Sequence, residues 1–151
     1  MTRPDISFAV NRGCQFMQSP SDVHWTFVKR ILRYLKGTIN MGLSFSHSDS
    51  FSISAFSGAN WFGCPDDRKS TGGFAIYLGP NLISRKAHKQ STVARSNTEL
   101  EFRVLADTTA EFVCLSSLLR DLGVPLSSPP IMWCGNISAT YLAANPIFQL
   151  P

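Results

Sequence analysis

The chain has 151 residues, of which 44% are hydrophobic and 16% are charged, with a net charge of +4. This length suits one domain with a short appended element; the composition excludes a disordered chain, and the charge slightly favours polyanionic partners. No signal peptide, membrane-length apolar run or Cys-x-x-Cys pair is present, so we expect an intracellular protein (cytoplasm or nucleus), not secreted, without a membrane partner or a zinc knuckle.

Two amphipathic helices are predicted at the start of the chain. Apolar residues recur at helical spacing over residues 5–17, with Pro4 suited to the first turn. A second helix is predicted from Ser21, a good N-cap, to about Lys36. Its periodicity predicts four buried apolar side chains, those of Trp25, Val28, Leu32 and Leu35. Residues 1–40 are therefore expected to form a helical pair.

Short strands, a long helix, one more strand and a last helix are predicted after this pair. Alternating apolar residues and turn signals predict strands at 41–46, 51–56, 73–78 and 82–86. Gly72 and Gly73 indicate a bulge or a close approach between strands. Ser96 or Asn97 is predicted to cap a long helix that Gly123 stops. Pro129 and Pro130 precede a strand predicted at 131–134, and a last helix is predicted at about 138–144. This order predicts an α/β fold with a mixed sheet and helices on its faces.

Several sequence motifs follow one another along the whole chain in the order of a known family. They are Arg3–Ile6, His24-Trp25, Arg33–Thr38, Asn60–Gly73, Leu82–Ser84, Lys89-Gln90, Ser96–Arg103, Trp133–Ala139 and Ala144–Pro146. Each is weak alone, but the collinear set is specific. The chain resembles the retrovirus-related Pol polyproteins of copia-type LTR retrotransposons, from the end of the reverse transcriptase region into the adjoining ribonuclease H domain.

The resemblance implies two parts and a chemistry. Residues 1–40 would be a helical remnant of the reverse transcriptase C-terminal region, and residues 41–151 a ribonuclease H-like domain truncated before its last strand and helix. The family activity is metal-dependent hydrolysis of the RNA strand in RNA–DNA hybrids. Two Mg²⁺ ions carry such a reaction, and clustered carboxylates hold them against their mutual repulsion.

The acidic positions implied by the resemblance are mostly lost in this sequence. The Asp of the first domain strand falls on Gly58, and a second Asp of that motif has become Asn60. The helix Glu is retained as Glu101, with Glu99 the less favoured register. The later Asp falls on Gly135, and the final acid lies beyond the end of the chain. One carboxylate of four does not hold two magnesium ions, so we expect no bound Mg²⁺ and an inactive pseudoenzyme.

Other residues have two interpretations each. Glu101 is either a vestigial ligand or an ordinary Glu in the first helical turn. Asp66 and Asp67, beside Arg68, are better explained by a local turn than by substitute metal ligands. A basic set predicted to follow a nucleic acid backbone, or else to form a solvated rim, consists of Arg85, Lys86, His88, Lys89 and Arg95.

Three functions therefore remain open from the sequence. The first is an inactive retrotransposon-derived ribonuclease H-like domain that at most binds hybrid or duplex nucleic acid weakly. The second is an active ribonuclease H with a substitute ligand set. The third is a non-enzymatic interaction module, in which the sheet edge exposed beside residues 131–134 binds a partner or a second copy.

Overall fold

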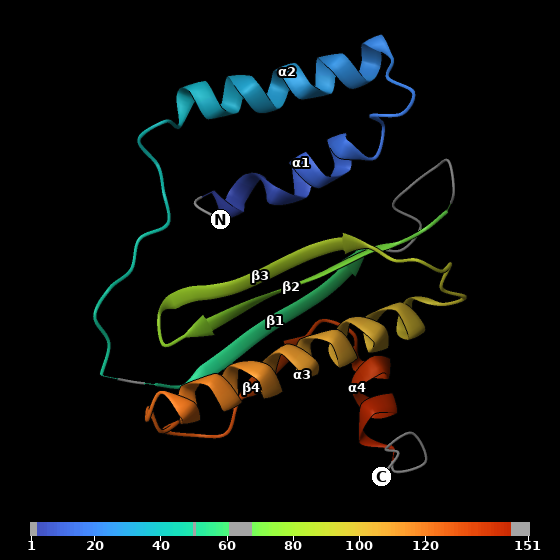
Figure 1. The fold of residues 1–151 in the computed structure, drawn as a ribbon. Helices are drawn as coiled ribbons and strands as arrows, with labels where there is room; N and C mark the ends of the chain where they lie inside the picture. Colours follow the sequence, from blue (N-terminus) through green and yellow to red (C-terminus); the bar gives the residue numbers. More distant parts are fainter. Residues whose placement is uncertain (1–2, 50, 61–67, 146–151) are drawn as a thin grey trace. The chain divides into compact units, whose positions relative to one another are not determined.

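The computed structural model describes residues 3–49, 51–60 and 68–145. Contacts divide the chain into two compact units, Met1–Ser44 (unit 1) and Phe45–Pro151 (unit 2). Both units are drawn in Figure 1, and each is described by itself. In the part of the chain that the structure describes, no helix combines the length and the apolar character needed to cross a membrane.

Unit 1 is a helical hairpin, as the sequence predicts. A 3-10 turn, Pro4–Ile6, leads into α1 (Ser7–Cys14), and α2 covers Asp22–Gly37. Ser21 caps α2: its hydroxyl oxygen accepts from the backbone N–H of His24 at 3.5 Å, and the His24 ring accepts from the backbone N–H of Ser21 at 3.2 Å. The His24 ring also stacks on Phe16, with 4.1 Å between ring centroids, which ties the start of α2 to the segment after α1.

The predicted burial of α2 is wrong for two of its four residues. Trp25 and Leu32 are each 54% exposed, whereas Val28 and Leu35 are half-buried. The reason is that α1 has only eight residues and covers one side of α2, on which Phe27 and Ile31 also lie. Among the described residues of the two helices none is fully buried. Unit 1 therefore has contacts between its helices but lacks a dry core of its own.

Unit 2 is built on a four-stranded mixed sheet. Its strands are β1 (Ile53–Asn60), β2 (Thr71–Leu78), β3 (Asn81–Lys89) and β4 (Ile131–Cys134). The order is β3-β2-β1-β4; the first three strands are antiparallel, and β4 runs parallel to β1. Helix α3 (Asn97–Asp121) lies along one face of this sheet, and α4 (Ile137–Ala144) packs against α3 (Figure 1). The mixed α/β class expected from the sequence is confirmed.

The strand predicted at 41–46 is absent. This segment has no regular secondary structure, and the backbone of Ser46 is held by a side chain: Ser46 N–H donates to Asn81 Oδ1 and Asn81 Nδ2 donates to the Ser46 carbonyl, both at 2.8 Å. The side chain of Asn81 thus supplies the hydrogen bonds to the Ser46 backbone that a neighbouring strand would otherwise supply. The strand predicted at 51–56 exists but extends to Asn60, because Gly58 pairs with Gly73 and does not end it.

The core of unit 2 lies between the sheet and α3. Its buried residues are Ile53, Ala55, Phe74, Ile76 and Phe112. Gly72 allows this packing, since a Cβ there would overlap the Cγ2 atom of Val104 on α3. A Cβ on Gly73 would come within 2.6 Å of the Lys86 carbonyl oxygen. The predicted close approach at these two glycines is confirmed, while the irregular pairing of β2 with β3 lies elsewhere, between Ile76 and Tyr77.

Candidate functional site

The candidate site lies where the parallel pairing of two neighbouring strands ends. The pairing of β1 with β4 ends at Ser57 and Cys134, which are partners in the parallel register. Gly58 is the next residue of β1, and Gly135 is the first residue after β4, so the two follow side by side. A Cβ built on either glycine meets no atom within 4 Å, which means that open space adjoins both positions.

Glu101 approaches this point from α3. Its Oε1 atom accepts a hydrogen bond from the backbone N–H of Ala59 at 3.2 Å, directly after Gly58. The fold thus brings Glu101 beside Gly58, and Gly135 directly follows the end of the adjoining strand β4. Ser96 begins the helix that carries Glu101, because its hydroxyl oxygen accepts from the Glu99 backbone N–H at 3.1 Å, as its predicted capping role requires.

The Glu101 carboxyl is buried and half satisfied. The residue is 6% exposed, and its Oε2 atom is buried with no hydrogen-bond partner among the described residues. Burial raises the pKa of Glu101 above the usual value for a Glu, and the hydrogen bond from Ala59 opposes this only in part. A buried carboxylate oxygen without a hydrogen-bond partner is costly, which is why burial disfavours the charged form of Glu101.

Glu99 has a structural role at the start of α3, a role that the sequence alone allows for Glu99 or Glu101. Its Oε2 atom accepts from the backbone N–H of Arg95 at 2.9 Å, and its Oε1 atom accepts from Arg103 Nη2 at 2.6 Å. Both contacts stabilise the start of α3. Glu99 is therefore occupied at the helix surface, whereas Glu101 points to the strand ends.

The residues at this point do not fit a pair of magnesium ions. Gly58 and Gly135 offer only backbone groups, and Asn60, at the end of β1, carries no charge. Within residues 3–49, 51–60 and 68–145, no group of three or more His, Cys, Asp or Glu side chains has an arrangement suited to a metal ion. Mg²⁺ needs several oxygen ligands, and the charge that holds two such ions together would here come from Glu101 alone. Asp66 and Asp67 lie outside the described residues.

The basic residues predicted as a nucleic-acid surface do not form one row. Neighbouring residues of a strand point to opposite faces of a sheet, so Arg85 and Lys86 on β3 diverge. His88 is directed to α3, with its Nε2 atom 3.3 Å from Asp107 Oδ2. Arg95 lies beyond the strand, in the segment before α3. By the same alternation Arg85 and Lys89 share one face of the sheet, and Lys86 and His88 share the other. The basic set is thus divided, and binding of a nucleic acid backbone by any part of it stays a prediction.

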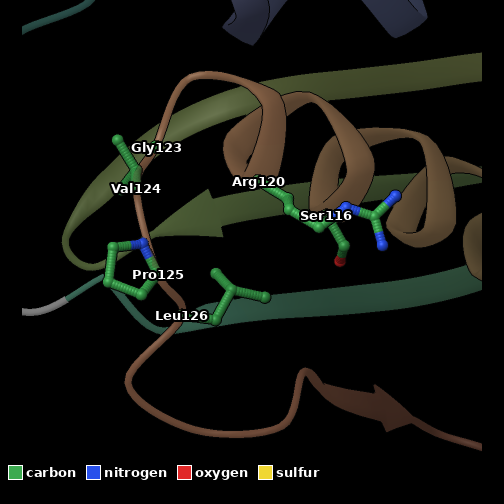
Figure 2. Close-up of a pocket in the computed structure, with 6 residues that line it drawn as sticks. All are labelled: Ser116, Arg120, Gly123, Val124, Pro125 and Leu126. Atoms are coloured by element: carbon green, nitrogen blue, oxygen red, sulfur yellow. The ribbon is translucent and has the colours of Figure 1, made fainter.

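A shallow cavity of about 530 Å³ lies at the other end of α3 (Figure 2). It is lined by Ser116, Arg120, Gly123, Val124, Pro125 and Leu126. The last turns of α3 and the loop that follows provide these residues. None of the residues expected to act in the site lines this cavity, and its walls are mainly apolar.

The raised pKa of Glu101 predicts how stability depends on pH. A folded-state pKa above the unfolded value means that the native chain binds more protons, so stability is full at low pH and falls as pH rises from about 4.5 through the folded pKa. Glu101→Gln keeps the acceptor for Ala59 and removes the titration. We expect its melting temperature to match that of the native chain at pH 4 and to exceed it at pH 7, measured by circular dichroism. A gap between the two proteins that does not change with pH would contradict this.

The chain is similar to segments of much longer proteins. It is 48% identical over 148 residues to the retrovirus-related Pol polyprotein from transposon RE2 of Arabidopsis thaliana, and 49% identical over 148 residues to that from transposon RE1. Each match covers 98% of the chain and 10% of the polyprotein, so the chain spans about a tenth of their length. It is also 39% identical over 120 residues to the secreted RxLR effector protein 161 of Plasmopara viticola, covering 80% of the chain and 84% of that protein. No family model and no solved structure matches.

Proposed function

We propose, since the chain belongs to the family of the retrovirus-related Pol polyproteins from transposons, that it is a retrotransposon-derived ribonuclease H-like domain that no longer cleaves RNA. The resemblance to the copia type implies metal-dependent hydrolysis of the RNA strand in RNA–DNA hybrids as the activity that has been lost. The mixed sheet, with one long helix along its face, supports this assignment of unit 2. Unit 1 is then the remnant of the reverse transcriptase region.

The observation that carries the loss of activity is the pair of glycines beside Glu101. Gly58 and Gly135 follow the paired ends of β1 and β4, where the resemblance implies two aspartates. Each change from Asp to Gly removes a ligand and one negative charge. Glu101, the remaining acid of the implied set, is buried, and burial raises its pKa above the usual value for a Glu. One carboxyl does not supply the several anionic oxygens that hold two hard cations, so the arrangement lacks the charge that the reaction requires.

A cleavage assay tests this proposal directly. We expect the 151-residue chain to leave the RNA strand of an RNA–DNA hybrid intact in the presence of Mg²⁺ or Mn²⁺, because Gly58 and Gly135 supply no carboxylate beside Glu101 to hold the ions. The measurement is electrophoresis of labelled RNA, with a catalytically complete ribonuclease H as the positive control. Cleavage above background that Glu101→Ala abolishes would show that the chain is an active ribonuclease H with a substitute ligand set.

A second candidate function is supported by the edge of the sheet. Strand β4 pairs with β1 on one side only among the described residues, and it carries no charged side chain that would block pairing. Ile131 is 52% exposed and Trp133 58% exposed. An interaction module would use this edge to add a strand from a partner or a second copy. Light scattering at high protein concentration tests whether the edge binds a second copy. A chain that stays monomeric at every concentration would contradict self-association.

A further inference from the structure

The excess positive charge of the chain belongs to unit 1. Residues 1–44 contain six Lys and Arg against two Asp, whereas residues 45–151 contain eight basic and eight acidic residues. The net charge of +4 is thus carried by the smaller unit, and unit 2, with the proposed ribonuclease H-like fold, is neutral as a whole. Four of the six cations of unit 1 lie on α2 within eight residues: Lys29, Arg30, Arg33 and Lys36.

Three of these cations share one face of α2. Lys29, Arg33 and Lys36 are separated by four and three residues, which places them on one side of a helix. This side points away from α1, because the half-buried residues of α2, such as Phe27 and Ile31, lie on the opposite side. All three cations are exposed. The exposed Trp25 borders the same side, and the Nζ atom of Lys29 lies 5.5 Å from the centre of its ring.

Helix stability does not explain this arrangement. The C-terminal end of a helix favours cations, but the effect is limited to the last turn, in which only Lys36 lies. Lys29 and Arg33, four residues apart with the same charge, repel each other. The two acids of unit 1 do not pair with these cations: Asp5 is bound by Arg3 at 2.8 Å, and Asp22 lies in the first turn of α2, seven residues before Lys29. Within the described part of unit 1, the three cations therefore form a positive surface without a paired acid.

We propose that this surface binds the phosphate backbone of duplex nucleic acid without reading its sequence. It consists of Lys29, Arg33 and Lys36, with Trp25 at its border, and is called the α2 basic face. Seven residues of helix span about 10 Å, which corresponds to about three phosphates along one strand of a duplex. The inference deepens the proposed function and depends on it for the class of ligand. It places the contact on unit 1 and not on the basic set of β3.

The distribution of residues on α2 favours nucleic acid over a lipid surface. A helix that lies in a membrane interface presents a continuous apolar face to the lipid and its cations at the rim. In α2 the side on which Phe27 and Ile31 lie is covered by α1, and the free side carries the cations. Apolar groups on the exposed surface are interrupted by charge, so phosphates can be contacted but acyl chains have no continuous face to meet.

The test compares two triple variants that each remove three positive charges. Lys29→Ala/Arg33→Ala/Lys36→Ala removes the α2 basic face and keeps good helix formers, while Arg85→Ala/Lys86→Ala/Lys89→Ala is the matched control on β3. Binding of the full chain to a labelled 20-base-pair RNA–DNA hybrid is measured by fluorescence anisotropy between 50 and 200 mM salt, without divalent cations. Circular dichroism confirms that each variant is folded.

We expect the native chain to bind with a strong salt dependence, because three phosphate contacts weaken binding about 40-fold over this fourfold rise in salt. The α2 variant should bind at least tenfold more weakly at 50 mM salt and lose most of this salt dependence, and the β3 variant should differ from the native chain by less than twofold. Equal loss in both variants, loss in the β3 variant alone, or no binding by the native chain would overturn the proposal.

One further assay, and the omission of divalent cations from the binding assay, separate the alternatives. Vesicles of phosphatidylserine and phosphatidylcholine replace the hybrid in a sedimentation assay, and binding to the vesicles without binding to the hybrid would overturn the inference in favour of a lipid surface. Because no divalent cation is present, hybrid binding is measured whether or not the chain can cleave. Failure of the inactive assignment in the cleavage assay is therefore distinguishable from failure of the α2 basic face.

Discussion

Replacing Gly58 and Gly135 together by Asp is expected to give the chain a divalent-cation site. The backbone already places both positions next to each other at the ends of β1 and β4, and added Cβ atoms meet nothing within 4 Å. The two new carboxylates would then converge with that of Glu101, and the mutual repulsion of the three is relieved when a cation binds. We expect Mn²⁺ to bind with micromolar affinity in isothermal titration calorimetry, whereas the native chain should give no heat of binding.

The matched control is Gly58→Asn/Gly135→Asn, which adds side chains of the same shape without charge. This variant should remain folded and should bind Mn²⁺ no better than the native chain. If the Asp variant is folded and gives no heat, the three positions do not form a site. Equal binding by both variants would show that charge is not the property that was lost.

Gly72→Ala is expected to lower the free energy of unfolding by about 1–3 kcal/mol, because overpacking a tight core forces its neighbours to move. The methyl group would overlap Val104, which is 1% exposed and so lies within the packed interior. In a chain of 151 residues, each kcal/mol lowers the melting temperature by roughly 2–4 °C. Thermal and urea unfolding followed by circular dichroism measure both quantities.

Gly58→Ala is the control for this experiment, since Gly58 lies in the neighbouring strand and its Cβ position is open. There the same change should leave stability unchanged or raise it slightly, because alanine restricts the unfolded chain more than glycine. Adding Val104→Ala to Gly72→Ala should recover part of the loss, since it removes the atom that is overlapped. Equal effects of Gly72→Ala and Gly58→Ala would show that the tight contact with α3 does not limit stability.

Local features of the fold could be predicted from the sequence. Ser21 and Ser96 act as helix caps because a short polar side chain before an apolar period satisfies free backbone N–H groups. The strand at 131–134 was predicted with its observed bounds, since prolines and a glycine delimit it. The mixed sheet was predicted from the order of the strands and helices along the chain. Each of these predictions uses only neighbouring residues or the order of elements in the sequence.

Features that depend on distant partners could not be predicted. The segment 41–46 has a strand-like pattern but is held by Asn81, 35 residues after Ser46. Trp25 and Leu32 fit a helical period, yet their burial depends on how far α1 reaches. The basic residues of β3 are neighbours in sequence but are divided between two faces of a sheet.

The candidate site shows the same limit. The resemblance selects Gly58, Glu101 and Gly135 one at a time, and nothing local indicates that they adjoin. Their neighbourhood follows from the parallel register of β1 with β4, in which Ser57 is the partner of Cys134. The burial of Glu101, and with it the direction of its pKa shift, depends on that same long-range packing.

The buried residues of α3 are confined to its first part, from Leu100 to Phe112, although the helix continues to Asp121. Local opening of a helix proceeds from the end that has the fewest tertiary contacts. Amide protons of the last two turns should therefore exchange with solvent long before those near Glu101. Glu101, which contacts β1 through Ala59, therefore lies in the half of α3 that is expected to open last.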